Sequence, residues 1–97
     1  MQLILYTKPG CHLCVGLYEK LQVIKKRPAR TCDFTLEIRD IMTRDDWFQM
    51  YHYEVPILTL LVETELDGVI NQEEKLIPRM SPRLTVDQVE ENLCKYL

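Results

Sequence analysis

The hydrophobic pattern of the first thirty residues predicts a strand followed by a helix. Residues 2–6 form a short apolar run, which is typical of a buried strand. Pro9-Gly10 interrupts this run, because these two residue types punctuate regular structure. From there on apolar residues recur at spacings of three and four, as on one face of a helix, at Cys14, Leu17, Leu21 and Ile24. Pro28 is expected to end the helix, since the residue before a proline is disfavoured in the α region.

The middle of the chain predicts a second strand and a short helix. Residues 34–39 alternate strictly between apolar and polar types, which indicates a strand with one wet face at the edge of a sheet. Thr43 is the expected N-cap of the helix, with Asp45 and Asp46 in its first turn. The helix then presents an apolar cluster that is typical of core packing: Trp47, Phe48, Met50 and Tyr51.

The last third predicts a hairpin and a final helix. Residues 57–62 are almost continuously apolar, which suits a strand buried on both faces. Asp67-Gly68 is a hairpin signal, and a fourth strand follows somewhere within residues 69–79. Thr85 and Gln88 form a capping box that opens the final helix. Its expected inner face consists of Val86, Val89, Leu93 and Leu97.

These elements follow the order βαβαββα, which predicts an α/β layered domain. The first three strands are separated by helices, so parallel pairing with right-handed crossovers is expected among them. The closing hairpin would add an antiparallel edge. With 97 residues, the chain is predicted to form a single domain over residues 1–97.

Charge and composition limit the classes of partner that the protein is expected to bind. The chain carries 12 Lys and Arg against 15 Asp and Glu, a net charge of -3, which argues against nucleic acid or an anionic membrane as its main partner. The basic run at residues 25–30 is interpreted as the solvated end of a helix. Residues 3–6 lack a basic flank typical of a signal peptide, and residues 57–62 are too short to span a bilayer. A cytoplasmic protein, monomeric and without a membrane partner, is therefore expected.

The chemistry of the chain is expected at Cys11 and Cys14. Because Pro9-Gly10 ends a strand, Cys11 falls at the first turn of a helix, where unpaired N–H groups and the helix dipole favour an anion. Such a position lowers a cysteine pKa and so favours the nucleophilic thiolate. Cys14 shares the helix face at disulfide-compatible spacing and begins the apolar stripe, so it is expected to be the more buried thiol. An exposed attacking sulfur beside a buried resolving sulfur is what dithiol exchange requires.

The stretches LYTKPGCHLC and EVPILTL resemble the glutaredoxin-like branch of the thioredoxin superfamily. The resemblance implies a thioredoxin-like sandwich, a four-stranded mixed sheet flanked by helices. It also implies that Cys11 attacks, that Cys14 resolves, and that Pro56 is a cis proline beside the pair. Lys8 and the backbone of Val55 would face a bound thiol substrate.

Two departures from that family bear on the substrate. His12 and Leu13 stand between the cysteines in place of Pro-Tyr or Pro-Phe. Residues 79–83 read RMSPR where glutaredoxins have a Gly-Gly turn followed by an acid that holds glutathione. Pro82 lacks a backbone N–H, although Arg79 and Arg83 could bind a carboxylate in another way. Glutathione is thus a possible co-substrate, but one that this site is expected to handle poorly, and no resident cofactor is predicted.

Other interpretations of the cysteines and histidines remain. Cys11 and Cys14 could supply two ligands of a zinc or iron–sulfur site, within one chain or shared by a dimer as in some glutaredoxins, although no second CxxC accompanies them. A non-catalytic binding domain on the same fold is a third possibility. Cys32 and Cys94 are expected to be free structural thiols, with a disulfide between them as the alternative. His12 either supports the Cys11 thiolate as an imidazolium or is simply an exposed polar residue.

The sequence therefore predicts a thiol–disulfide oxidoreductase without a metal ion. Cys11 and Cys14 are its predicted catalytic residues, and Lys8, His12, Val55 and Pro56 its predicted substrate-binding residues. The substrate would be a thiol or disulfide, carried either by a protein or by glutathione.

Overall fold

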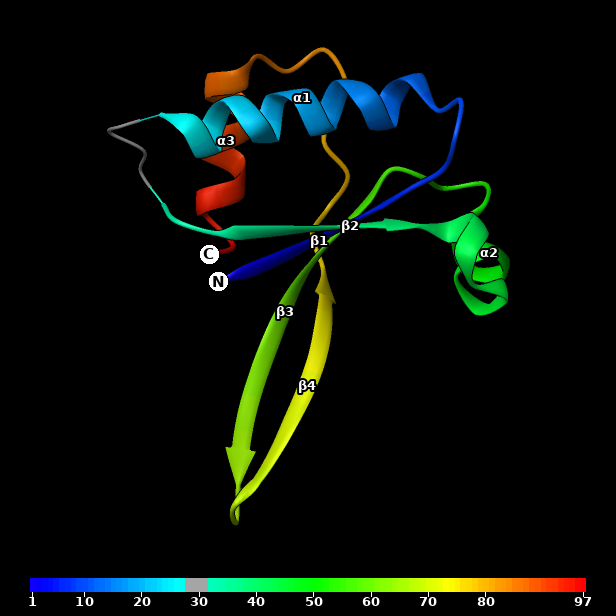
Figure 1. The fold of residues 1–97 in the computed structure, drawn as a ribbon. Helices are drawn as coiled ribbons and strands as arrows, with labels where there is room; N and C mark the ends of the chain where they lie inside the picture. The colour runs from blue at the N-terminus through cyan, green and yellow to red at the C-terminus, as the bar shows by residue number, and fades with distance from the viewer. Residues whose placement is uncertain (28–31) are drawn as a thin grey trace.

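A computed structural model describes residues 1–27 and 32–97 of the chain. The predicted order of elements is confirmed, with one short 3₁₀ helix, η1, added (Figure 1). The elements are β1 (Gln2–Thr7), α1 (His12–Lys26), β2 (Thr35–Asp40), η1 (Ile41–Thr43), α2 (Asp45–Tyr51), β3 (Ile57–Leu66), β4 (Val69–Leu76) and α3 (Val86–Cys94). Pro28, the predicted end of α1, and the last residues of the basic run lie outside the described residues.

The four strands form one mixed sheet in the order β2-β1-β3-β4. β1 pairs in parallel with β2, and the alternating strand β2 lies at an edge as predicted. The prediction that β3 also runs parallel is wrong, because β1 and β3 are antiparallel. The reason is the length of α2: seven residues rise about 10 Å, whereas a six-residue strand is about 20 Å long. The chain therefore stays at the carboxyl end of β1, and β3 starts there, with Ile57 opposite Tyr6.

Alternate residues of β1 point to opposite faces of the sheet and enter two separate hydrophobic clusters. Leu3 and Leu5 pack with buried residues of α1 and α3, which cover one face (Figure 1). Ile4 and Tyr6 join the second cluster, which includes Cys14 and is partly covered by the aromatic residues of α2. The fold thus holds the start of α1, and with it Cys14, against the carboxyl end of β1.

The predicted helix faces are largely confirmed. In α1 the predicted apolar stripe is buried or partly buried, and in α3 both bonds of the capping box at Thr85 and Gln88 are present. The predicted N-cap of α2 is wrong: Arg44 holds that position, and the Thr43 hydroxyl donates instead to the Asp40 carbonyl in η1. Met50 is exposed, unlike the aromatic residues beside it. No helix within the described ranges is long and apolar enough to cross a membrane.

The hairpin of β3 and β4 is longer than the hydrophobic pattern predicts. The apolar run 57–62 is only its inner part, and β3 continues through four further residues to Leu66. The predicted turn at Asp67-Gly68 is confirmed, with φ of 54° and 78° at the two positions. β1 pairs with β3 no further than Leu61, so the hairpin extends past the rest of the sheet (Figure 1).

Cys32 and Cys94 form a disulfide, which corrects the expectation that both are free thiols. Cys32 lies just before β2, and Cys94 is the last residue of α3, with 5.7 Å between their Cα atoms. The two positions are 62 residues apart in the sequence, and the cluster in which Phe34 packs with Val89 and Leu93 of α3 brings their surroundings together. The structure thus contains the Cys32–Cys94 disulfide, which the sequence analysis gave as the alternative.

Candidate active site

The turn between β1 and α1 places Cys11 as the N-cap of the helix. The Cys11 N–H donates to the Lys8 carbonyl at 3.3 Å, and Gly10 completes the turn at φ 80°, a conformation that favours glycine. The backbone of Cys11 is extended, and its Sγ accepts the N–H of Cys14 at 3.2 Å. A side chain in this position is directed at the unpaired N–H groups of the first helical turn. Any negative charge that forms on Cys11 Sγ is therefore stabilised by the helix.

Cys11 and Cys14 are joined by a disulfide, and their surroundings differ in the predicted sense. Their Cα atoms are 5.3 Å apart. Cys14 is 3% exposed within the cluster that also holds Tyr6 and Val55, whereas Cys11 is only partly buried at the edge of that cluster. The structure thus pairs an accessible sulfur with a buried one.

The segment before β3 lies against this pair. Val55 is buried in the same cluster as Cys14, and the peptide bond between Val55 and Pro56 is cis, the isomer that the resemblance implies. The Val55 N–H donates to the Tyr51 carbonyl at 3.1 Å, which fixes the segment to the end of α2. Lys8 Nζ donates to the His52 carbonyl at 3.2 Å. Lys8 therefore connects the turn before Cys11 to the segment before Pro56.

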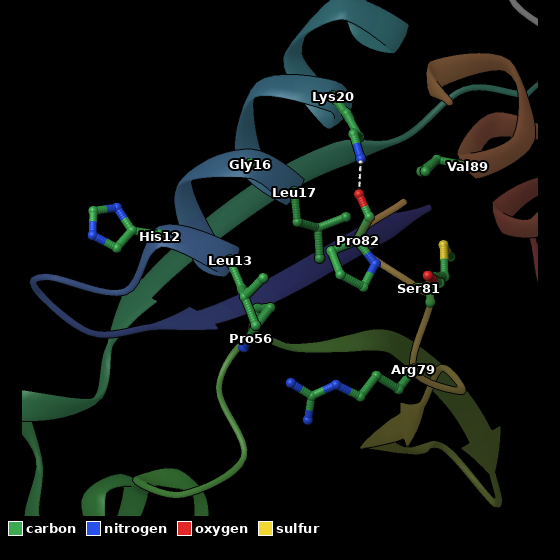
Figure 2. A pocket seen from close by; sticks show the side chains of 11 residues that line it. His12, Leu13, Gly16, Leu17, Lys20, Pro56, Arg79, Ser81, Pro82 and Val89 are labelled. Carbon is green, nitrogen blue, oxygen red and sulfur yellow. Dashed lines mark hydrogen bonds between the residues drawn. The ribbon is translucent and has the colours of Figure 1, made fainter. Parts of the chain in front are cut away.

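A groove of about 250 Å³ runs beside the site, between α1 and residues 79–82 (Figure 2). His12, Leu13 and Pro56 line its end nearest the cysteines, and the apolar side chains of Leu17 and Val89 line it further along. His12 is exposed at this rim. The groove is thus mostly apolar and begins one residue after Cys11.

Two cations at the groove are already engaged with backbone carbonyls. Lys20 Nζ donates to the Pro82 carbonyl at 2.9 Å, which joins α1 to the opposite wall (Figure 2). Arg79 Nη1 donates to the Glu54 carbonyl at 3.3 Å. Lys20 did not emerge from the sequence as a site residue, although its spacing from Leu13 and Leu17 places all three on one helix face.

A family model for the Glutaredoxin-like domain (DUF836) matches residues 2–94. The chain belongs to this glutaredoxin-like family. Among solved structures, thioredoxin 1 from the thermophilic eubacterium Thermosipho africanus is similar with a TM-score of 0.57 and 18% identity. That match covers 99% of this chain and 93% of the thioredoxin chain. This structural similarity shows that the glutaredoxin-like domain has the thioredoxin fold. Among curated proteins, no sequence matches this chain.

Behind the site, the glutaredoxin-like domain contains a polar network that reaches from β1 to β4. The Tyr6 hydroxyl donates to Glu74 Oε1 at 2.5 Å, and the Thr59 hydroxyl donates to the same oxygen at 2.9 Å. Arg39 Nη1 donates to the Tyr6 oxygen at 2.9 Å. Burial, followed by the hydrogen bond and charge of Glu74, raises the pKa of Tyr6 to about 12, against the opposing effect of Arg39. The network therefore holds a neutral Tyr6 in the cluster that contains Cys14.

No group of three or more His, Cys, Asp and Glu side chains in residues 1–27 and 32–97 of the glutaredoxin-like domain converges as a metal site. Cys32 and Cys94 are bonded to each other, so in this state neither completes a ligand set with Cys11 and Cys14. Within this arrangement, Cys11 and Cys14 remain a disulfide-bonded pair three residues apart.

Proposed function

We propose that this glutaredoxin-like domain is a thiol–disulfide oxidoreductase in which Cys11 attacks the substrate and Cys14 resolves. The observation that carries the proposal is the position of Cys11 Sγ, which caps α1 and accepts the Cys14 N–H. In the reduced state the same contacts favour a thiolate on Cys11, the nucleophile of disulfide exchange. The burial of Cys14 supports its role as the sulfur that acts second.

The proposed reaction transfers two electrons from the dithiol to a substrate disulfide. The Cys11 thiolate attacks one substrate sulfur, the substrate S–S bond breaks, and the first substrate thiolate leaves and takes up a proton. Cys14 then loses its proton and attacks Cys11 Sγ, which breaks the mixed disulfide and releases the second substrate thiolate. The product is the Cys11–Cys14 disulfide, the state that this structure contains. A reducing thiol pair would reverse these steps to regenerate the dithiol.

The segment at Val55-Pro56 and the groove are proposed to hold the substrate beside Cys11. Pro56, His12 and Leu13 line the groove end nearest the cysteines, and Lys8 fixes the segment before Pro56 through the His52 carbonyl. Lys8, His12 and Pro56, together with Val55, are the substrate-binding positions predicted from the sequence, and their common location beside Cys11 supports that assignment. Leu13 was not among the predicted positions.

We further propose that glutathione is a poor substrate of this site. Glutathione carries two carboxylates, and binding them requires free cationic or N–H donors. Lys20 and Arg79 both donate to carbonyls of the chain, and Pro82 has no N–H to offer. Reduction of a glutathionylated peptide should therefore be slow beside reduction of a protein disulfide by the same preparation. Equal rates, weakened by Arg79→Ala or Arg83→Ala, would contradict this expectation.

The roles of the two cysteines can be tested by trapping the intermediate. The reduced Cys14→Ser variant should form a stable mixed disulfide with a substrate, because the resolving thiol is missing, whereas reduced Cys11→Ser should form none. A Cys32→Ser/Cys94→Ser variant serves as the background for both, so that only the candidate site contains thiols. Mass spectrometry of the adducts identifies the bonded cysteine. Adducts formed by Cys11→Ser and absent from Cys14→Ser would reverse the assignment.

A further inference from the structure

We term residues 63–76 the arm: beyond Leu61 and its partner Glu74 the hairpin is a two-stranded ribbon, and the last residues of the arm, 74–76, pair with the part of β3 that lies in the four-stranded sheet. The pairing of β1 with β3 ends at Leu61, so beyond that point β3 has only β4 as a partner among the described strands (Figure 1). An isolated two-stranded ribbon is at best marginally stable in water, because neither face is covered. The arm is therefore a part of the fold that gains stability when another chain covers it.

The arm exposes large apolar side chains at its end and along β4. Leu66, Val69, Ile70 and Leu76 are between 58% and 69% exposed. Leu66 and Val69 are cross-strand partners next to the turn, so their side chains share one face of the ribbon. Ile70 lies on the other face, because successive strand residues alternate. Both faces of the arm thus offer apolar contacts.

The net negative charge of the molecule is concentrated in the arm. It contains five acids and one base, Lys75, for a formal charge of -4, whereas the whole chain carries -3 and the other residues together carry +1. Glu74 is engaged by Tyr6, Thr59 and Arg39, but the other acids of the arm lie at the surface. These are Glu63, Glu65, Asp67 and Glu73. Like charges oppose the pairing of two arms, so the charge favours a basic occupant over a second copy.

β4 presents its outer backbone edge as a pairing site. The Ile77 N–H donates to the Leu58 carbonyl, so position 77 points its backbone groups toward β3. Since antiparallel ladders alternate, positions 70, 72, 74 and 76 point their N–H and C=O groups away from β3. β4 is the edge strand of the described sheet. An extended peptide can therefore add to it as a further strand.

The edge of β4 leads directly to the candidate active site. Leu76 and Ile77 line a hollow that Pro56 and Met80 also line, and these two residues in turn line the groove beside Cys11. β3 starts right after Pro56 and runs for ten residues, about 33 Å, to the turn of the arm. A polypeptide paired with β4 would thus extend toward the sulfur of Cys11.

We propose that the arm docks an extended, basic segment of a protein disulfide substrate and directs its disulfide into the groove. The proposal rests on the proposed oxidoreductase function and names its substrate class as polypeptides, as opposed to small thiols. The basic side chains meet the acids of the arm, the backbone pairs with β4, and apolar side chains cover Ile70 and Leu76. Docking adds binding energy and leaves the chemistry at Cys11 unchanged.

The test compares two synthetic peptide substrates, each with one intramolecular disulfide loop followed by an eight-residue tail. The tail alternates Lys with Val in one peptide and Glu with Val in the other, and bis(2-hydroxyethyl) disulfide serves as a substrate without a tail. The Lys-Val peptide should have a kcat/KM at least about tenfold higher, because several exposed ion pairs and a strand pairing add up. The difference should lie in KM and shrink with added salt.

Variants of the arm and a matched control variant test whether the preference for the Lys-Val peptide depends on the arm. Glu73→Lys should lower kcat/KM for the Lys-Val peptide by about fivefold, since it replaces an attraction by a repulsion. Ile70→Ser should lower it through lost apolar contact, at equal kcat. Glu91→Lys, the same change at an exposed acid of α3, should leave all rates as they are. All three variants should reduce bis(2-hydroxyethyl) disulfide like the parent chain.

The outcomes separate this proposal from the proposed function. Equal kcat/KM for the two peptides, with normal reduction of bis(2-hydroxyethyl) disulfide, would overturn the docking role alone. If no disulfide is reduced, the proposed function fails, and fluorescence anisotropy of the labelled Lys-Val tail without cysteines still measures docking to the arm. A dimer in sedimentation that Ile70→Ser dissociates would assign the arm to a second copy and overturn the proposal.

Discussion

The two disulfides of this chain lie at opposite ends of the sheet and connect the chain over different distances. Cys11 follows the carboxyl end of β1, whereas Cys32 precedes Thr35, which pairs with Gln2 at the start of β1. The Cys11–Cys14 pair closes a separation of three residues within one helical turn, and the Cys32–Cys94 pair closes 62 residues between two elements.

This difference predicts different consequences for the two pairs. A disulfide stabilises a fold mainly by restricting the unfolded chain, and the effect grows with the length of the closed loop. A cysteine at a helix N-terminus instead gains reactivity, because the helix stabilises its thiolate. The short pair is therefore suited to exchange and the long pair to holding α3 in place.

The largest expected effect concerns exchange activity. Cys11→Ser should lower the rate of disulfide reduction on the order of a thousandfold or more, because the proposed nucleophile is lost. Replacing both Cys32 and Cys94 by serine should leave that rate within about twofold, since distant sites act independently. Reduction of bis(2-hydroxyethyl) disulfide under saturating reductant measures both. Comparable losses in the two variants would show that the pairs act as one system.

The next effect concerns the free energy of unfolding. Here removal of the Cys32–Cys94 pair should have the larger effect, in contrast to its small effect on activity. Without reductant, the Cys32→Ser/Cys94→Ser variant should lose about 4 kcal/mol of its free energy of unfolding, as expected for a closed loop of this length. Opening the short pair by Cys11→Ser should cost only about 2 kcal/mol on the same scale. Urea denaturation gives both values, and with reductant the parent and the double variant should converge. Equal losses from the two changes would contradict the assignment of a structural role to the long pair.

A smaller difference is expected between the reduction potentials of the pairs. The Cys11 thiolate is stabilised by the N–H of Cys14, which favours the reduced form of the short pair. The fold favours the oxidised form of the long pair by the amount that this disulfide stabilises the fold. With a difference of about 2 kcal/mol, Cys11–Cys14 should be reduced at potentials about 40 mV less negative than Cys32–Cys94. Alkylation and mass spectrometry across a series of glutathione redox buffers resolve the two transitions, and the reverse order would contradict the comparison.

The smallest expected effect is a pH dependence of stability caused by Tyr6, which lies in the same buried cluster as Cys14. Because the folded pKa of Tyr6 is raised to about 12, the contribution of Tyr6 to stability is complete below the unfolded value near 10 and is lost as the pH rises through 10 toward 12. The parent chain should thus lose about 1 kcal/mol more than Tyr6→Phe between pH 10 and pH 11. Urea denaturation at the two pH values measures this difference. Parallel pH profiles would show that Tyr6 titrates normally.

Most of the candidate site could be predicted because its parts are local. The break at Pro9-Gly10, the spacing of the two cysteines and the apolar stripe that starts at Cys14 all lie within neighbouring turns. Helical geometry converts such separations directly into positions in space. The direction of β3 could not be predicted in this way, because it depends on where the short helix α2 packs against the sheet.

The sequence by itself determined the order of elements, the N-terminal position of Cys11 on its helix and the burial of Cys14. Only the tertiary structure decided that Cys32 pairs with Cys94, that Lys8 binds the His52 carbonyl, and that the outer part of the β3–β4 hairpin projects as an arm. The physical reason is the range of the interactions involved. Propensity, capping and periodicity act over a few residues, whereas these contacts join positions tens of residues apart and form only once the sheet and helices have packed.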